Sequence, residues 1–333
     1  MGKTRNETGS VLFLEVTMIQ RYPAVLLVLA LVLAGLTIWV LVRQRAAGPV
    51  LLESAYATPL PRPEGPLSVY HLGHSLVGRD MPAMLAQLAG RGHDYASQLG
   101  WGSSLMDHWE PTIEIQGFRE ENAHPRFRAA YPAISSGDYD AVILTEMVEL
   151  RDAIRWHNSS RYLHLWANLA RVAREDTQVY LYETWHPLTD PDWLGRLDND
   201  LETLWERRLL GPDLVATKGQ RPVHVIPAGQ VLAAFVRKVE EAGGIDNIHD
   251  RTALFARDDK GDLDSIHLND LGNYLVALVH YATLYHRSPV GLPHELLRAD
   301  GTPAAAPGPQ AAQVMQETTW EIVTSYEKTG VAP

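Results

Sequence analysis

The chain contains no cysteine among its 333 residues. Disulfide bonds, a thiol nucleophile and thiolate metal ligands are therefore all excluded. Basic residues are also few, because 29 Lys and Arg stand against 40 Asp and Glu, which gives a formal net charge of −11. Since nucleic acids are bound by positive surfaces, this composition predicts that nucleic acid is not a partner.

The sequence also lacks a spacing of histidines and carboxylates that is typical of a metal site. The chain has 14 histidines, but no pair combines the spacing of metal ligands with nearby carboxylates. We therefore expect no metal and no cofactor. Hydrophobic residues make up 46% of the chain, which is enough for one sizeable core in one or two domains.

The sharpest change in composition lies near the N-terminus, where residues 23–42 carry no charge. A helix of about 20 residues, rising ~1.5 Å per residue, covers the ~30 Å of a bilayer core. The apolar region of a cleaved signal peptide is shorter and ends at a small-residue cleavage site, whereas the one such pattern here, Ala55-Tyr56-Ala57, lies well beyond the run. We therefore predict a short N-terminal segment (1–22) and a single-pass membrane anchor (23–42).

Positive residues flank the predicted anchor on both sides. Three of them precede it and two follow it, namely Lys3, Arg5 and Arg21, then Arg43 and Arg45. This slight excess favours a cytoplasmic N-terminus and hence an extracytoplasmic, periplasmic location for the rest of the chain. Four prolines within residues 59–66 indicate a stiff linker over 43–66. The main domain is expected over 67–299, followed by a low-complexity tail (300–333) with a candidate helix at Gln316–Lys328.

Beyond the linker, short apolar runs alternate with segments of helical periodicity. Strands are expected over Ser68–Leu72, Tyr95–Leu99, Asp140–Thr145, Gln178–Trp185 and Pro222–Ile226. Helices are expected over Met81–Arg91, Arg161–Arg174, Leu197–Leu210, Gly229–Ala242 and Asn269–Arg287. The alternation predicts an α/β protein, a three-layer α/β/α sandwich with a mostly parallel, flavodoxin-like sheet of about five strands.

Ser75 directly follows the first predicted strand. Ligands bind beyond the C-terminal ends of such strands, and a following helix offers backbone N–H groups to an oxyanion. A serine before a helix is also a common N-cap, so this segment alone leaves two interpretations open.

Asp264 and His267 stand three residues apart, just before the last strongly predicted helix. A hydroxyl nucleophile needs a base to take its proton, and the base needs an acceptor that orients it. The alternative is a surface turn rich in aspartate, because Asp258, Asp259 and Asp262 lie directly upstream.

Together, these segments resemble the SGNH/GDSL hydrolase superfamily, the serine esterase and acyl hydrolase type. Gly73-His74-Ser75 is similar to its block one, and Asp264-Ser265-Ile266-His267-Leu268-Asn269, with Gly272 after it, is similar to block five. The segment Gly100-Trp101-Gly102-Ser103-Ser104-Leu105 resembles block two, in which a glycine N–H faces the oxyanion. The resemblance covers residues 67–287.

The resemblance implies a serine hydrolase with Ser75 as nucleophile, His267 as base and Asp264 as the residue that orients it. The backbone N–H groups of Ser75 and Gly102 would bind the oxyanion. The expected reaction is cleavage of an ester, an acyl or acetyl group on a small molecule or a carbohydrate, through a covalent acyl-enzyme. Two alternatives remain open: an O-acyltransferase on a surface polysaccharide, and a non-catalytic binding protein on a hydrolase fold.

Two positions depart from the family pattern. His74 replaces the usual Asp or Asn before the serine, and we expect it to shape the loop. The Asn of block three, the third oxyanion donor, is missing from Leu144-Thr145-Glu146-Met147. This leaves Thr145, Glu146 or a donor from elsewhere. Because an ionised Glu146 would repel an oxyanion, we expect it to point away and pair with an arginine, rather than to donate as a protonated acid.

Several aromatic residues have two interpretations each. Trp185-His186-Pro187 follows a predicted strand and either lines the pocket or packs as a turn. Trp101, Trp109 and Trp156 either stack on a sugar ring or fill the core and its rim.

Overall fold

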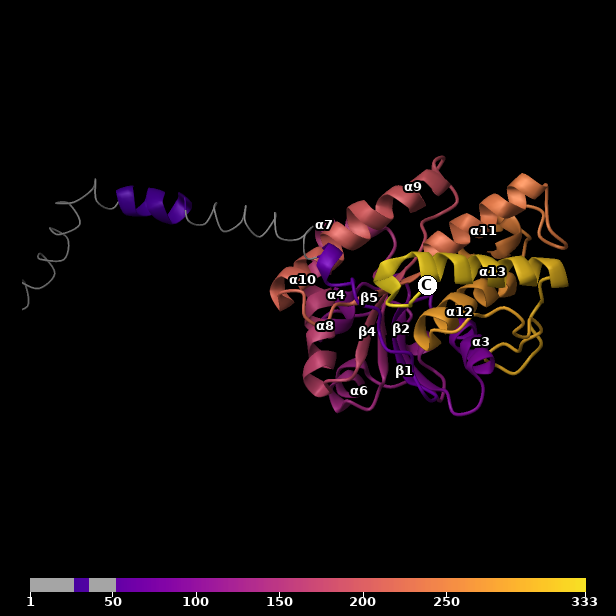
Figure 1. The fold of residues 1–333 in the computed structure, drawn as a ribbon, viewed down its shortest axis with the longest axis horizontal. Coiled ribbons are helices and arrows are strands. Elements are labelled where there is room, and N and C mark those ends of the chain that lie inside the picture. The colour runs from indigo at the N-terminus through magenta and orange to yellow at the C-terminus, as the bar shows by residue number, and fades with distance from the viewer. Residues whose placement is uncertain (1–26, 36–51) are drawn as a thin grey trace, which may run out of the picture. The chain divides into compact units, whose positions relative to one another are not determined.

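A computed structural model of the chain describes residues 27–35 and 52–333 (Figure 1). The chain divides into two compact units, Met1–Pro49 and Val50–Pro333. In the first unit, residues 27–35 form a helix whose leucines and valines are more than half exposed. Among the described residues, none of the helices combines the length and the apolar character needed to span a bilayer. The predicted anchor at 23–42 lies mostly outside the described residues and stays a prediction.

The second unit is built on a parallel sheet. Within residues 52–333 it has five strands in the order β2-β1-β3-β4-β5. The strands are β1 (Ser68–His74), β2 (Asp94–Gly100), β3 (Ala141–Leu144), β4 (Gln178–Glu183) and β5 (His224–Pro227). Because β1 pairs with both β2 and β3, the strand order reverses at the C-terminal ends of β1 and β3, where open α/β sheets place their sites. The predicted α/β fold with a five-stranded, flavodoxin-like sheet is confirmed.

Each face of the sheet has its own core. In β3, Ile143 faces one core while Val142 and Leu144 face the other, as the two-residue period of a strand requires. The first core is covered by α3 (Asp80–Ala89), α11 (Ala228–Ala242), α12 (Asp270–Tyr285) and α13 (Pro309–Ser325), and the second by α4 (Leu105–Trp109), α6 (Ala130–Ser136), α8 (Ser159–Ala173) and α10 (Gly211–Thr217). Figure 1 shows these two helical layers on opposite sides of the strands.

Shorter elements complete the second unit. These are α5 (Phe118–Glu121), α7 (Leu150–Trp156), α9 (Trp193–Asp200), the π-helical segment η1 (Leu201–Leu210), the 3-10 turns η2 (Arg251–Leu254) and η3 (Glu327–Thr329), and the antiparallel pair β6 (Phe255–Arg257) and β7 (Leu263–Leu268). The predicted helix at Leu197–Leu210 is therefore part of a longer helical stretch that joins α9, η1 and α10.

The compact unit is larger than the predicted domain at 67–299. Leu52 and Tyr56 are buried in the second core, and the Tyr56 hydroxyl donates to the carbonyl of Val223 at 2.7 Å. The predicted linker at 43–66 is thus partly docked on the domain, through apolar side chains that precede its four prolines within 59–66. The C-terminal helix begins at Pro309 instead of Gln316, since Pro suits the first turn of a helix and Asp246 accepts from the backbone N–H of Ala311 at 2.8 Å.

Candidate active site

Ser75 lies in the tight turn between β1 and α3. The backbone N–H of Val77 donates to the carbonyl of His74 at 2.9 Å, and Gly78 has a left-handed φ of 58°, a conformation that favours glycine. The N-cap of α3 is Arg79, so Ser75 is not the helix cap that the sequence left open. Its hydroxyl lies beyond the strand end and is directed to a histidine.

The Ser75 hydroxyl, the His267 ring and the Asp264 carboxylate form a continuous chain of hydrogen bonds. Nε2 of His267 lies 2.8 Å from Oγ of Ser75, and Nδ1 of the same ring lies 2.7 Å from Oδ2 of Asp264. Asp264 and His267 belong to strand β7 rather than to an open turn. The structure thus places the three residues that the sequence analysis named as nucleophile, base and orienting residue each within hydrogen-bond distance of the next.

The Asp264 carboxylate is held by backbone as well as by the ring. Its Oδ1 accepts from the backbone N–H groups of Ile266 at 2.9 Å and His267 at 3.0 Å. Partial burial acts to raise the pKa of Asp264, but these N–H groups and the imidazole outweigh it and lower the pKa below the usual range. An ionised carboxylate at this position favours the tautomer of His267 with its proton on Nδ1, which leaves Nε2 free to accept from Ser75.

Gly102 lies beside Ser75 at the end of β2. It has a left-handed φ of 56°, and it lines the same pocket as Ser75 and His267. Two side chains tie this loop to β1: Oγ of Ser103 donates to the carbonyl of Gly73 at 3.2 Å, and Nε2 of His108 lies 2.8 Å from the same oxygen. The backbones of the serine turn and the glycine loop are therefore fixed relative to each other.

His74 borders the pocket at Ser75, but both of its ring nitrogens are engaged by backbone groups. Its Nε2 lies 2.9 Å from the carbonyl oxygen of Glu146, and its Nδ1 accepts from the backbone N–H of Leu76 at 3.3 Å. Complete burial lowers the pKa of His74 to about 4, so the ring is neutral at neutral pH. This matches the expected loop-shaping role.

The two candidates for the third oxyanion donor, Thr145 and Glu146, do not line the pocket around Ser75. Thr145 is fully buried against Gly73, where an added Cβ would lie 2.6 Å from the Thr145 Cβ. Glu146 is fully buried, and its Oε1 accepts from the backbone N–H groups of Leu105 at 3.3 Å and Met147 at 2.8 Å.

The expectation for Glu146 was right in direction and wrong in partner. The side chain turns away from Ser75, as expected, but backbone N–H groups replace the expected arginine. Burial raises the pKa of Glu146 to about 7, against the opposing effect of its hydrogen bond from Met147. The Ser159 hydroxyl, which lies 13 residues further along the chain, also acts to lower this pKa, and the sequence does not show that it meets Glu146.

Trp185 packs as a turn rather than lining the pocket. Its indole N–H donates to the carbonyl of Ile266 at 2.8 Å, and the backbone N–H of Leu188 donates to the carbonyl of Ser265 at 2.8 Å. Both acceptors lie between Asp264 and His267 in the chain. The loop after β4 therefore supports the backbone that carries these two residues.

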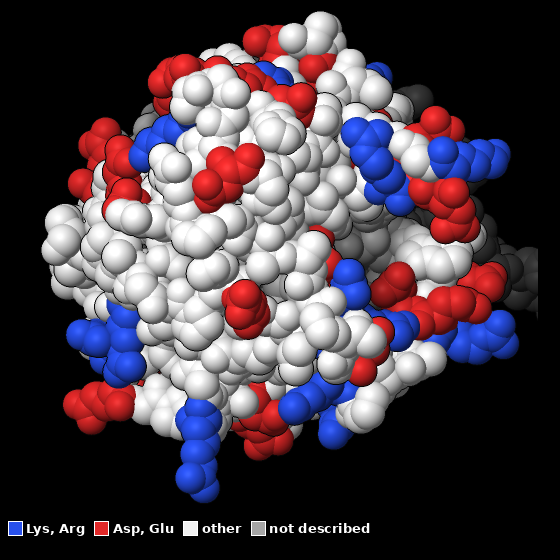
Figure 2. Space-filling view, turned by 90° about the vertical axis from the view of Figure 1, so that its right-hand side faces the viewer, with Lys and Arg blue, Asp and Glu red and all other residues white. Residues whose placement is uncertain are grey.

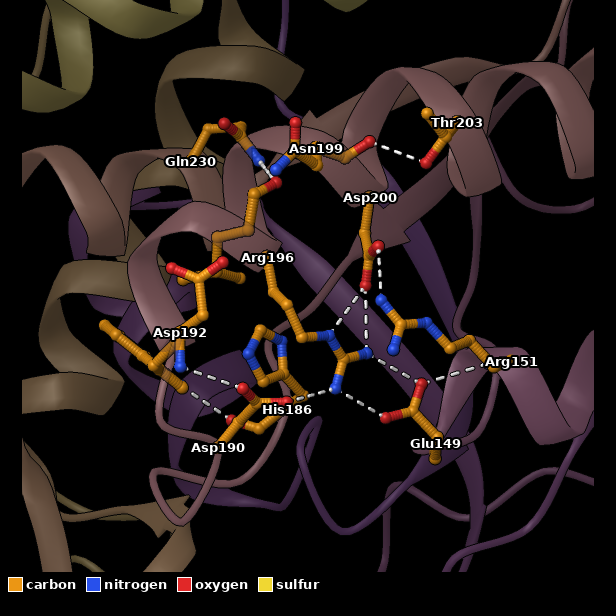
Figure 3. Close-up of polar contacts among 12 residues, drawn as sticks. Glu149, Arg151, His186, Asp190, Asp192, Arg196, Asn199, Asp200, Thr203 and Gln230 are labelled. Atoms are coloured by element: carbon orange, nitrogen blue, oxygen red, sulfur yellow. Dashed lines mark hydrogen bonds and ion pairs between the residues drawn. The ribbon is translucent and has the colours of Figure 1, made fainter.

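The same loop is braced by a cluster of charged side chains, shown in Figure 3. The guanidinium of Arg196 lies 2.9 Å from Glu149, 2.8 Å from Asp190 and 2.9 Å from Asp200. The Arg196 side chain is only 12% exposed and its three partners are partly buried, so these ion pairs are less screened by solvent than pairs between fully exposed side chains. Asp190 and Asp200 lie close to Arg196 in the chain, but Glu149 lies 47 residues before it, and no local pattern shows that the four side chains meet.

Two pockets open at Ser75. One, of about 530 Å³, is lined mainly by uncharged side chains, among them Trp101, Val148 and Ile266. The other, of about 800 Å³, is strongly polar, with the charged side chains Arg79, Asp80, Glu121, Arg126, Arg298 and Asp300 in its walls. On the face shown in Figure 2, acidic and basic side chains are interspersed and rim a hollow. The net negative charge does not form one broad patch on that face.

The fold and this hydrogen-bonded chain define an α/β protein with a serine, histidine and aspartate at the switch point of its sheet. The chain is similar to a DUF4886 family protein from Bacteroides uniformis, with 16% identity and a TM-score of 0.47 over 79% of this chain and 96% of that one. It is also similar to a protein assigned as an SGNH hydrolase from Slackia heliotrinireducens, with 17% identity and a TM-score of 0.37 over 65% of this chain and 98% of that one. A third similar protein is assigned as a GDSL-like lipase from Parabacteroides merdae, with 11% identity and a TM-score of 0.39 over 66% of this chain and 95% of that one. The names of the latter two proteins are those of the superfamily that the motifs of this chain resemble. No family model and no curated protein matches the chain.

Proposed function

We propose that the protein is a serine hydrolase that cleaves an ester through a covalent acyl-enzyme on Ser75. The observation that carries this proposal is the continuous hydrogen-bonded chain from Ser75 through His267 to Asp264. A nucleophile within hydrogen-bond reach of a base that a third group orients is the arrangement that activates a serine hydroxyl.

In the proposed reaction, Oγ of Ser75 attacks the ester carbonyl while Nε2 of His267 takes the hydroxyl proton. The backbone N–H groups of Ser75 and Gly102 donate to the oxyanion. His267 then gives its proton to the leaving alcohol, and the acyl group stays on Oγ. A water molecule then attacks the acyl-enzyme while Nε2 of His267 takes its proton, and His267 gives this proton to Oγ of Ser75 as the carboxylic acid leaves. Throughout, Asp264 stabilises the charged imidazole.

Solvent access supports hydrolysis over acyl transfer. The His267 side chain is 43% exposed, so water reaches the base that must activate it in the second half of the reaction. A transferase would need to keep water from this nitrogen while an acceptor hydroxyl occupies it.

Labelling with a fluorophosphonate probe tests the nucleophile without knowledge of the substrate. We expect one probe adduct, located at Ser75 by mass spectrometry of peptides, and none on Ser75→Ala. Ser265→Ala is the matched control, because this serine lies beside Asp264 and should leave labelling intact. A wild-type protein that is folded but takes up no probe would contradict the proposal and favour a binding protein on this fold.

We propose also that residues 23–42 anchor the protein in a membrane, with the second unit outside the cytoplasm. Support comes from the uncharged run itself and from the exposed apolar side chains of helix 27–35. Full-length protein should sediment with membranes, whereas a variant lacking residues 1–49 should be soluble. A variant that starts at Leu67 should be less stable than the one that starts at Val50, since it also loses Leu52 and Tyr56 from the core. Full-length protein that remains in the soluble fraction would refute the anchor.

A further inference from the structure

We propose that the indole of Trp101 is a platform on which a sugar ring of the substrate stacks, so that the ester cleaved at Ser75 is carried by a carbohydrate. The inference rests on the proposed function and names its substrate class. Trp101 lines the 530 Å³ pocket together with Ser75 and His267, yet 52% of its surface is exposed. An indole that is half exposed at the mouth of the pocket that holds Ser75 offers an open aromatic face to a ligand bound there.

The ring is fixed in place from several directions. Its Nε1–H donates to Oε1 of Glu121 at 2.8 Å, and its backbone N–H donates to the carbonyl of Gln116 at 2.7 Å. One face of the indole lies directly on Gly117, where an added Cβ would come within 2.2 Å of Cδ2 of the ring. A side chain at this position would displace the indole, and the φ of 63° at Gly117 also favours glycine.

The partner of the indole is itself tied to the nucleophile turn. The guanidinium of Arg79, four residues after Ser75, donates from Nε to the carbonyl of Glu121 at 3.2 Å and also donates to the carbonyl of Glu120. Through Arg79 and Glu121 the ring therefore holds a set position relative to Ser75. A preorganised aromatic surface loses little conformational entropy when a ligand binds.

The chemistry around the ring suits a pyranose. One face of a pyranose presents C–H groups, which pack on an aromatic face, and its edge presents hydroxyls, which need hydrogen-bond partners. Glu121 borders both pockets at Ser75. Its carboxylate uses one acceptor position for the indole, out of about four that a carboxylate offers, so it can also accept from a sugar hydroxyl. The polar pocket beyond it, with Arg126 and Arg298 in its walls, would receive the next hydroxyl-rich part of the substrate.

The test compares two acetylated polyols, of which only one has a ring. Acetate release is measured from glucose pentaacetate and from glycerol triacetate with the wild type, Trp101→Leu and Trp101→Phe. We expect Trp101→Leu to lower kcat/KM for glucose pentaacetate, mainly through KM, by about tenfold more than it lowers kcat/KM for glycerol triacetate. Trp101→Phe should recover part of the loss. Trp156→Leu is the matched control, because Trp156 is 63% exposed and lies on α7 outside both pockets.

A binding measurement that needs no turnover completes the test. Saturation-transfer NMR of glucose pentaacetate with Ser75→Ala should show transfer to the ring protons. The transfer should be lost when Trp101→Leu is added and kept when Trp156→Leu is added. Equal losses on both esters, or unchanged transfer without Trp101, would overturn the platform while the hydrolase proposal stands. If the wild type cleaves neither ester and Ser75 takes up no probe, the hydrolase proposal fails, and the NMR result alone decides on the platform.

Discussion

Two carboxyl groups at the C-terminal edge of the sheet, those of Asp264 and Glu146, have opposite electrostatic properties. Asp264 is about one-third exposed, and its two oxygens together accept from two backbone N–H groups and an imidazole. Its pKa is lowered. Glu146 is fully buried and accepts from two backbone N–H groups on a single oxygen, and burial raises its pKa to about 7.

The difference shows that solvent access and the distribution of donors, rather than residue type, decide which carboxylate stays ionised. The sign of the pH dependence follows. Stability contributed by Asp264 is present above its unfolded pKa and is lost as pH falls through the lowered folded value. For Glu146 the folded state binds the proton more tightly than the unfolded state does. The stability that this group contributes is therefore fully present below the unfolded pKa and is lost as pH rises through the folded value of about 7.

The largest effect on the reaction rate is expected for Ser75 and His267, the nucleophile and base that Asp264 serves. Ser75→Ala and His267→Ala should each lower kcat for 4-nitrophenyl acetate by a factor on the order of 10⁶, and the double variant should be little worse, because the residues act as a unit. Steady-state kinetics measure this, with circular dichroism as the control for folding. A Ser75→Ala protein with full activity would refute the assignment.

The positions of Ser75, Asp264 and His267 relative to the predicted strands and helices could be predicted from the sequence. Ser75 follows a short apolar strand, and Asp264 and His267 stand three residues apart, so local spacing alone brings the latter two together. The parallel sheet then brings β1 to the segment before α12. The contacts that support the backbone of Asp264 and His267 could not be predicted. The indole N–H of Trp185 donates to the carbonyl of Ile266 from a loop 81 residues away in the chain.

The surroundings of Glu146 were beyond sequence reasoning for a different reason. An acidic residue at the end of a buried strand needs hydrogen-bond donors. Nearly every residue has a backbone N–H group, so the sequence does not show which of these groups will donate. The sequence therefore favoured an arginine. For the same reason it could not show that Thr145 packs against Gly73, a contact between adjacent strands that leaves the third oxyanion donor unassigned.

The second largest effect is expected for Asp264→Asn. The asparagine would keep its carbonyl oxygen for the backbone N–H groups and turn its NH₂ toward Nδ1 of His267. That favours the tautomer with the proton on Nε2, which cannot accept from Ser75. In serine proteases the same exchange costs about 10⁴ in kcat, and we expect a loss of this order, smaller than that of Ser75→Ala. Kinetics between pH 6 and 9 measure it; a loss below tenfold would show that Asp264 does not set the tautomer.

A smaller effect, on stability rather than on rate, is expected for Glu146→Gln. The amide oxygen can replace Oε1 as the acceptor for Leu105 and Met147, while the ionisable group disappears. Because the folded pKa of about 7 lies above the unfolded one, ionisation of Glu146 costs up to about 3 kcal/mol at pH 8.5. Urea denaturation should show that the variant is more stable than wild type at pH 8.5 and about equally stable at pH 4. Turnover of 4-nitrophenyl acetate should change less than about twofold, and a large loss at every pH would make Glu146 a catalytic residue.

The smallest effect is expected at the neighbouring strand end, for Glu183→Gln. Burial raises the pKa of Glu183 to about 8, so ionisation at alkaline pH should cost stability there as well. Unlike Glu146, however, Glu183 accepts on both oxygens, from the backbone N–H and the side-chain amide of Gln230 at 3.2 and 3.1 Å. A glutamine would place its own NH₂ against one of these donors and lose about 1 kcal/mol. Removing the charge gains more than this at alkaline pH, because the folded pKa of about 8 lies well above the unfolded one. The effect of the lost hydrogen bond is therefore isolated at pH 4, where both glutamates are protonated in the folded protein. There, urea denaturation should show Glu183→Gln to be less stable than wild type by about 1 kcal/mol, whereas Glu146→Gln should differ little from wild type. Equal stability of Glu183→Gln and wild type at pH 4 would mean that the number of accepting oxygens does not distinguish the two buried glutamates.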